Sequence, residues 1–344
     1  MRPEAFVMSS TIIDQLETYG PRCCPRLDYE QAVAYTRDLA RTHYENFTVV
    51  SRMLPRTLRD DFGHVYAFCR WADDLGDETG DPQRSVELLT WWREELDACY
   101  GGAPRHPVFV ALRPTIEQHD IPRRPFDDLI DAFLQDQRMD RYATWDQVLD
   151  YCTRSANPVG RLVLYLCDYR DTQRQRFSDA TCTALQLANF WQDVRRDVLE
   201  RERVYVPHEV ATACGLDVEA MVAAIRADGE AEAATAGGCC PGRRLPSAGI
   251  TALLPGYRKT LRELVERTWP MYREGRALWP LVSGRLRIHV SLFTRGGESI
   301  LRLIERSDFN TLQHRPTLSR SRKVALMLGM AAESMAGWWR RRAG

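Results

Sequence analysis

Residues 66–78 read YAFCRWADDLGDE and residues 189–197 read NFWQDVRRD, and the interpretation of the chain starts from these two acidic stretches. Each contains two aspartates four positions apart, Asp73 with Asp77 and Asp193 with Asp197. On a helix this spacing places both carboxylates on one face, with their Cβ atoms about 6 Å apart. Oxygen ligands at such a separation suit hard cations such as Mg2+. We predict two helices that face each other, with Mg2+ and a diphosphate between them.

Acidic pairs at this spacing also occur on ordinary solvated helix faces. With 47 acidic residues among 344, about six such pairs arise by chance. The neighbouring residues argue against a solvated face, because Tyr66 and Arg70 fall on the same helical stripe as Asp73 and Asp77. Apolar residues on the other side of both segments predict buried helices. Buried carboxylates require a cationic partner or a metal.

The composition excludes several classes of protein. With 47 basic and 47 acidic residues the formal net charge is zero, so no general field attracts nucleic acid or anionic lipid. The ten cysteines form no CxxC motif, which favours a reducing compartment over a zinc site or a disulfide scaffold. The sequence shows neither a signal-peptide pattern nor a run of 18 apolar residues. We expect a cytoplasmic protein, with at most peripheral contact at the inner membrane face.

Helical periodicity extends over nearly the whole sequence, without a convincing set of alternating strands. We predict helices over residues 29–44, 58–77, 83–100, 107–119, 126–139, 145–166, 172–200, 218–227, 253–281, 286–307 and 319–341. Turn dipeptides such as Asn157-Pro158 and Ser283-Gly284 separate the periodic segments. The fold class is therefore all-α, with one domain over residues 28–344. Residues 1–27 lack periodicity and are expected to be poorly ordered.

Five segments in a fixed order resemble the squalene/phytoene synthase family of head-to-head prenyl synthases. They are HYENFTVVSRMLP, YAFCRWADDLGDE, YCTRSANPVG, QLANFWQDVRRDVLERERVYVP and ILRLIERSDFNTLQHRPTLSRSRK, between His43 and Lys323. The resemblance implies an isoprenoid-synthase helical bundle around a central cavity. Within the family, Glu45-Asn46-Phe47 and residues 189–193 are most similar to hydroxysqualene synthases of bacterial hopanoid pathways, which convert presqualene diphosphate to hydroxysqualene.

The chemistry of several candidate site residues follows from their type and position. Mg2+ bound by Asp73, Asp77, Asp193 and Asp197 would act as a Lewis acid on a leaving diphosphate. Arg70 can contact phosphate oxygens, although an ion pair with Asp73 or Asp74 is the alternative. The amides of Asn189 and Gln192 can bind phosphate or metal-bound water, and capping of nearby carbonyls is their alternative.

The resemblance implies the remaining roles. It places Phe47, Tyr66 and Tyr151 on an aromatic lining that stabilises a carbocation, with ordinary core packing as the alternative. It places Arg203 and Tyr205 at the closure of the diphosphate pocket. It also places Val159 and Gly160 at a helix break where chain and ligand approach closely. Tyr66, Arg70 and Tyr151 therefore join the four aspartates as candidate catalytic residues.

Two departures from the wider family bear on the substrate. Relatives often carry Ser-Lys-Ser where this chain has Tyr44-Glu45-Asn46, and often carry Arg where it has Gln192. Both changes remove a cation, which fits a substrate with one diphosphate. We expect presqualene diphosphate as substrate, no need for NADPH, no nucleic-acid partner, and functional coupling to a presqualene diphosphate synthase. The alternatives are a complete squalene synthase that condenses two farnesyl diphosphates with NADPH, and a non-catalytic assembly factor of the same fold.

Overall fold

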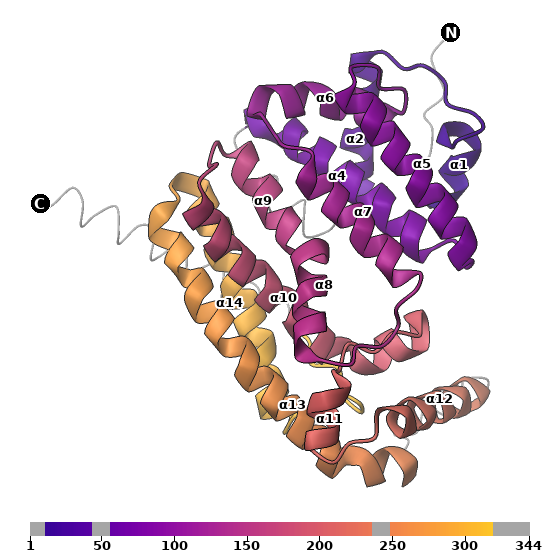
Figure 1. The fold of residues 1–344 in the computed structure, drawn as a ribbon, viewed down its shortest axis with the longest axis vertical. Helices are drawn as coiled ribbons and strands as arrows, with labels where there is room; N and C mark the ends of the chain where they lie inside the picture. Colours follow the sequence, from indigo (N-terminus) through magenta and orange to yellow (C-terminus); the bar gives the residue numbers. More distant parts are fainter. Residues whose placement is uncertain (1–10, 43–55, 236–247, 319–344) are drawn as a thin grey trace, which may run out of the picture. The chain divides into compact units, whose positions relative to one another are not determined.

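The computed structural model describes residues 11–42, 56–235 and 248–318. Within these ranges every regular element is a helix, apart from one isolated bridge between Arg141 and Val204, which confirms the all-α prediction. The helices in Figure 1 are α1 Ile12–Tyr19, α2 Tyr29–Thr42, α4 Arg56–Asp77, α5 Pro82–Tyr100, α6 Pro107–His119, α7 Arg124–Asp136, α8 Trp145–Ser155, α9 Asn157–Leu166, α10 Thr172–Arg201, α11 His208–Ala213, α12 Val218–Thr235, α13 Ala248–Gly275, the 3-10 helix η1 Arg276–Leu281 and α14 Gly284–Arg306.

The chain divides into two compact units. Unit 1 comprises Met1–Arg138 and Pro158–Gln175, and unit 2 comprises Met139–Asn157 and Arg176–Gly344. The single domain expected over residues 28–344 stays a prediction. Within the described residues, every helix is too short or too polar to cross a membrane.

Helix α4 is the central element of unit 1 and packs against α2, α5, α6 and α7 (Figure 1). Phe68, Trp71, Ala72 and Leu75 recur at helical spacing and are fully buried. Trp71 stacks on Trp92 of α5 at 5.3 Å between ring centroids. This apolar stripe fixes the rotation of α4, so that the opposite face is the one left to carry polar groups.

The end of α4 is held in place by contacts to the Gly76 carbonyl. Ser85 Oγ donates to this oxygen over 3.2 Å, and Gln137 Nε2 donates to it over 3.0 Å. A Cβ atom at Gly76 would lie 3.3 Å from the Cβ atom of Phe133 on α7, so the glycine permits the close approach of these helices. The last turn of α4, which carries Asp77, is thereby fixed.

Helix α10 is the long element of unit 2 that carries the second acidic stretch. Its apolar stripe of Leu187, Trp191, Val194 and Val198 is buried, as its spacing predicts. Trp191 Nε1 donates to Thr268 Oγ1 of α13 over 2.9 Å, and α13 in turn packs against α11, α12 and α14. The rotation of α10 therefore directs Asp193 away from the apolar contact with α13.

The structure corrects the expected order of the N-terminal segment. The sequence predicts disorder over residues 1–27, but residues 12–19 form α1. Thr11 and Asp14 form a reciprocal capping box at its start, and Ile12 is fully buried. A short helix without a long apolar period is stabilised here by its cap and by burial.

Other differences concern helix ends and one connection. The helix expected over residues 145–166 is two helices, α8 and α9, which separate at Ala156 next to the predicted Asn157-Pro158 break. Helix α11 was not predicted, because its six residues are too few to show a period. The helix predicted over residues 319–341 lies outside the described residues, as do Tyr44-Glu45-Asn46 and Phe47, whose roles were predicted from sequence.

Candidate functional site

The first acidic pair lies on the polar face of α4 in unit 1. Tyr66, Arg70, Asp73 and Asp77 are all partly buried there, opposite the fully buried stripe, as their spacing predicts. Arg70 Nη1 lies 3.7 Å from Asp73 Oδ2. The structure thus places all four predicted residues of this helix on one face, with the guanidinium beside the first aspartate.

Asp74 is a buried acid on α4 that the sequence analysis named only as an alternative partner of Arg70. Its side chain is 3% exposed and contacts Arg70 through Nη2–Oδ1 at 2.5 Å and Nε–Oδ2 at 3.1 Å. Burial raises the pKa of Asp74 to about 7, against the lowering effect of the Arg70 charge. Arg70 therefore forms the ion pair that was its alternative reading. The signal was present in the sequence as an arginine four residues before an aspartate.

The second acidic pair lies on α10 in unit 2, and its members have different surroundings. Asp193 is partly buried, whereas Asp197 is 8% exposed. Burial raises the pKa of Asp197 to about 7, and the charges of Arg201, Arg196 and Arg203 oppose this rise. Arg203 and Asp197 are joined by a 3.1 Å hydrogen bond from the Arg203 backbone N–H to the Asp197 carbonyl.

A segment distant in sequence covers this part of α10. Arg315 donates from Nε to Asp193 Oδ1 and from Nη2 to Asp193 Oδ2, the latter over 2.9 Å. These hydrogen bonds raise the pKa of Arg315 above its usual value. Gln192 Nε2 donates to the Pro316 carbonyl, so this amide caps a carbonyl, as its alternative reading predicted. Arg315 lies within the fifth quoted segment, but nothing in the sequence pairs it with Asp193.

A hollow of about 490 Å³ opens beside α10 in unit 2. Each of its three arginines is engaged by an acid, since Arg195 pairs with Asp228 over 2.8 Å, Arg196 pairs with Glu200 over 2.7 Å and Arg315 pairs with Asp193. A cation that binds here would compete with a guanidinium group for a carboxylate, and an anion would compete with a carboxylate for a guanidinium group. Its lining comprises Gln192, Asp193, Arg195, Arg196, Leu199, Glu200, Thr311, Leu312, Gln313 and Arg315.

Four aromatic rings form a cluster in unit 2. Tyr205 stacks on Phe190 at 3.7 Å and on Tyr142 at 5.6 Å between ring centroids. Tyr151 lies 5.7 Å from both Tyr142 and Tyr205, and both Tyr151 and Tyr205 are buried. The predicted residues Tyr151 and Tyr205 thus meet, and the cluster adds two rings that the sequence reading missed. The four aromatic residues lie on separate chain segments, so no sequence period predicts that they contact one another.

The remaining candidates are spread over both units. Asn189 is exposed on α10, one turn before Asp193. Val159 is exposed and Gly160 partly buried on α9, and both belong to unit 1. Phe47 lies outside the described residues. Because one acidic pair belongs to each unit, their approach across a common magnesium site stays a prediction.

The donor chemistry of each acidic pair fits Mg2+. Carboxylate oxygens are the ligands that this ion prefers, and it commonly takes only one or two of them together with water and phosphate oxygens. A cluster of three or more histidine, cysteine or acidic side chains able to hold a metal is absent from the described part of the chain. The two carboxylates of each pair are the kind of ligand that Mg2+ takes together with water or phosphate oxygens.

The sequence model of the squalene/phytoene synthase family matches residues 40–237 and 248–322 of this chain. The chain is 32% identical over 271 residues to the hydroxysqualene synthase of Rhodopseudomonas palustris, which covers 78% of this chain and 82% of that protein. It is 31% identical over 172 residues to the presqualene diphosphate synthase of the same organism, covering 50% of this chain and 61% of that protein.

Among solved structures, the squalene synthase HpnC from Alicyclobacillus acidocaldarius is 39% identical to this chain. The superposition has a TM-score of 0.70 and covers 82% of this chain and 96% of that one. The resemblance seen in the five sequence segments thus extends to the folded chain.

Proposed function

Because this chain belongs to the squalene/phytoene synthase family, we propose that it ionises presqualene diphosphate with Mg2+, releases diphosphate, and captures water to form hydroxysqualene. The observation that carries the proposal is the surroundings of Asp193. There, carboxylates suited to Mg2+ share one hollow with Arg315, a cation suited to diphosphate. The similarity to a hydroxysqualene synthase over 78% of the chain supports the choice of water as the final nucleophile.

In this proposal the four aspartates Asp73, Asp77, Asp193 and Asp197 bind Mg2+. The bound ion supplies Lewis acidity that neutralises the charge of the departing diphosphate. Arg203, which follows the second acidic stretch, binds oxygens of the diphosphate. When substrate enters, Arg315 releases the Asp193 carboxylate and binds the diphosphate in its place. Arg70 remains with Asp74 and orients Asp73 from one turn away.

The overall reaction balances as presqualene diphosphate and water giving hydroxysqualene, diphosphate and one proton. Loss of the carbon–oxygen bond leaves a cyclopropylcarbinyl cation, which rearranges and then opens its ring to an allylic cation. Water adds its oxygen lone pair to that cation and then loses a proton. Aromatic faces stabilise positive charge and exclude premature water. Phe47, Tyr66 and Tyr151 are the proposed lining, with Val159 and Gly160 beside the chain and Asn189 and Gln192 beside the diphosphate.

The second candidate is a complete squalene synthase. It is favoured by the 39% identity to a protein named squalene synthase HpnC. This reaction would start from two farnesyl diphosphates and would need a hydride from NADPH in place of water. Rhodopseudomonas palustris has both a hydroxysqualene synthase and a presqualene diphosphate synthase similar to this chain, which favours instead a pair of enzymes in which a sister protein supplies presqualene diphosphate. The long apolar substrate also suggests peripheral membrane contact at most.

The deciding experiment supplies the purified protein with farnesyl diphosphate or presqualene diphosphate, each with Mg2+ or EDTA and with or without NADPH. We expect hydroxysqualene from presqualene diphosphate with Mg2+ alone, carrying 18O when the reaction runs in labelled water. NADPH should change neither rate nor product. Squalene formed from farnesyl diphosphate only with NADPH would establish the second candidate. Absence of diphosphate release from either substrate would favour a non-catalytic protein.

A further inference from the structure

The segment between α10 and α11 carries Arg203 and Tyr205 and begins with an unusual backbone conformation. Glu202 has φ of 57°, in the left-handed region that costs a residue with a side chain roughly 1 kcal/mol. Arg203 and Tyr205 follow this residue directly and are both buried. The direction in which the two side chains leave the backbone therefore depends on a turn that requires outside support.

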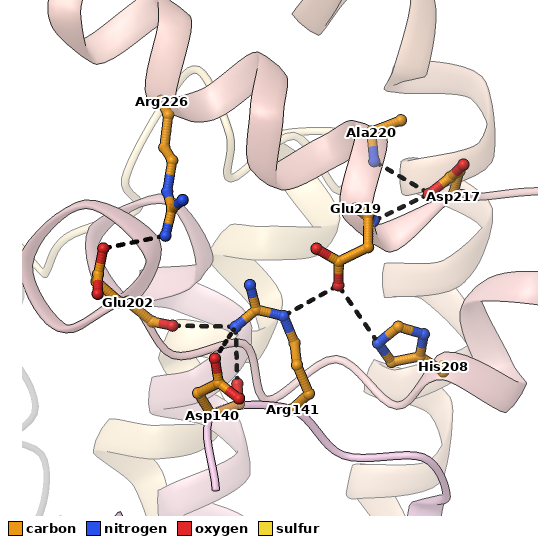
Figure 2. Close-up of polar contacts among 8 residues, drawn as sticks. All are labelled: Asp140, Arg141, Glu202, His208, Asp217, Glu219, Ala220 and Arg226. Atoms are coloured by element: carbon orange, nitrogen blue, oxygen red, sulfur yellow. Dashed lines mark hydrogen bonds and ion pairs between the residues drawn. The ribbon is translucent and has the colours of Figure 1, made fainter. Parts of the chain in front are cut away.

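Arg141, in the connection between α7 and α8, supplies that support (Figure 2). Its Nη1 donates to the Glu202 carbonyl over 3.0 Å and to the carbonyl of Asp140 over 3.0 Å. Its Nε donates to Glu219 Oε1 over 3.1 Å. The guanidinium thus joins two chain segments that lie 61 positions apart in sequence.

Both ends of this link are themselves fixed. Glu219 lies in the first turn of α12, where Asp217 Oδ1 accepts from the N–H groups of Glu219 over 2.9 Å and Ala220 over 3.0 Å (Figure 2). On the other side, Val204 N–H donates to the Asp140 carbonyl over 2.9 Å. A planar guanidinium can donate to the carbonyls of Glu202 and Asp140 and to Glu219 at the same time. A lysine ammonium on a flexible side chain cannot make all three contacts in this fixed geometry.

The turn held by Arg141 leads directly to the groups that act in the proposed site. The Arg203 backbone N–H donates to the Asp197 carbonyl over 3.1 Å. Tyr205 stacks on Phe190 of α10. A change of the Glu202 turn would shift both contacts together. A displacement of about 1 Å in a positioning contact is enough to change catalysis by up to about a hundredfold.

We propose that Arg141 is a positioning residue for the diphosphate-binding side, acting through the Glu202 carbonyl to set the placement of Arg203 and Tyr205. This proposal rests on the proposed function, because it takes Arg203 as a diphosphate contact. Arg141 itself contacts neither substrate nor metal in this account. Its effect passes through one backbone oxygen.

The chain provides a matched control in Arg226. Its Nη2 donates to the Glu202 carboxylate over 3.1 Å, on the same residue but away from the backbone (Figure 2). Arg226→Gln removes a positive charge and one hydrogen bond to Glu202, as Arg141→Gln does, but leaves the carbonyl contact intact. Comparison of the two variants therefore distinguishes the effect of losing a positive charge near Glu202 from the effect of losing the hydrogen bond to the Glu202 carbonyl.

The experiment compares wild type, Arg141→Gln, Arg141→Lys and Arg226→Gln. Hydrogen exchange is followed on residues 202–209, whose Val204, His208 and Glu209 amides bond Asp140, Tyr142 and Ala143. Affinity for inorganic pyrophosphate is measured by calorimetry with Mg2+. We expect Arg141→Gln to speed exchange of the Val204 amide and to weaken pyrophosphate binding, each by about tenfold. Arg141→Lys should rescue little of this loss, and Arg226→Gln should match wild type.

The outcomes separate the two proposals. Wild-type protein that fails to bind pyrophosphate with Mg2+ overturns the proposed function, whatever Arg141 does. Wild-type binding that Arg141→Gln leaves unchanged, or that Arg226→Gln weakens equally, overturns the positioning role alone. If Arg141→Gln does not fold, Glu219→Gln replaces it, because this variant keeps Arg141 and removes the negative charge that accepts from Arg141 Nε and lies 3.9 Å from His208 Nε2. A smaller loss of pyrophosphate affinity in Glu219→Gln is then the expected result, and wild-type affinity overturns the role.

Discussion

The two acidic pairs have the same spacing but different support. On α4 the polar face is organised from within the helix, because Arg70 reaches Asp73 and Asp74 from one turn away. On α10 the corresponding aspartate is held from outside, because Arg315 contacts Asp193 across 122 positions of sequence. Equal spacing therefore does not imply an equal environment. The first pair is a local structure, and the second depends on the packing of unit 2.

The buried acid also differs between the two helices. In the acidic stretch of α4 it is Asp74, which lies outside the pair at four-residue spacing, whereas in the acidic stretch of α10 it is Asp197, a member of the pair. Burial raises the pKa of each carboxyl to about 7. Asp74 is neutralised by its own helix, while the charges that act on Asp197 include Arg203 from the following segment. We infer a structural role for Asp74 and a binding role for Asp197.

The largest expected effect tests whether the two pairs are equivalent as metal ligands. Asp73→Asn and Asp193→Asn should each lower turnover with presqualene diphosphate by at least about a hundredfold, because each removes a charged ligand of Mg2+. Folding should be retained, since carboxylates that await a metal do not stabilise the metal-free protein. Turnover and thermal unfolding are measured on the same preparations.

Asp60→Asn is the control for Asp73→Asn. Both aspartates lie on α4 with side chains 43% exposed and an arginine nearby. Turnover of Asp60→Asn should equal that of wild type. Near wild-type turnover in either ligand variant would remove that aspartate from the site, and a large loss of stability without metal would assign it a structural role instead.

A smaller effect tests the local support of α4. Arg70→Gln leaves the buried Asp74 without its cation and should lower the free energy of unfolding by about 2 kcal/mol, because an unpaired buried acid is costly. Urea unfolding without metal gives this value. Arg84→Gln on α5 is the control, because Arg84 pairs with Glu87 at the surface and such pairs contribute about 0.5 kcal/mol. Equal losses in the two variants would show that Asp74 does not depend on Arg70.

The smallest effect tests the distant support of α10. Arg315→Gln frees Asp193 from a partly exposed ion pair of about 0.5–1 kcal/mol, so affinity for Mn2+ without substrate should rise about two- to fivefold. Electron paramagnetic resonance of free Mn2+ measures this affinity. Arg196→Gln is the control, because Arg196 lines the same hollow but pairs with Glu200. Unchanged Mn2+ affinity in Arg315→Gln would mean that the ion pair does not compete with metal.

Much of the first site could be predicted from sequence because its geometry repeats along one helix. Tyr66, Arg70, Asp73 and Asp77 share a face by spacing alone, and the structure places them on one. The same spacing gave the ion pair of Arg70 with Asp73 or Asp74 as the alternative to phosphate binding, and the structure contains the pair with Asp74. The contact of Gln192 could not be predicted in this way, because its carbonyl partner Pro316 is 124 positions away and no period connects them.

The helical class, the buried stripes of α4 and α10, the two acidic pairs and the family resemblance could all be predicted from the amino-acid sequence. The stripes and the acidic pairs follow from spacing over a few residues, which helix geometry fixes. The order of α1 depends instead on the burial of Ile12, and the ring cluster of Tyr151 and Tyr205 depends on contacts between separate segments. Tertiary packing also brings Arg315 to Asp193 and Arg141 to the turn at Glu202. Burial and contacts between distant residues depend on how the helices pack. Because packing depends on many side chains together, no single motif predicts these contacts.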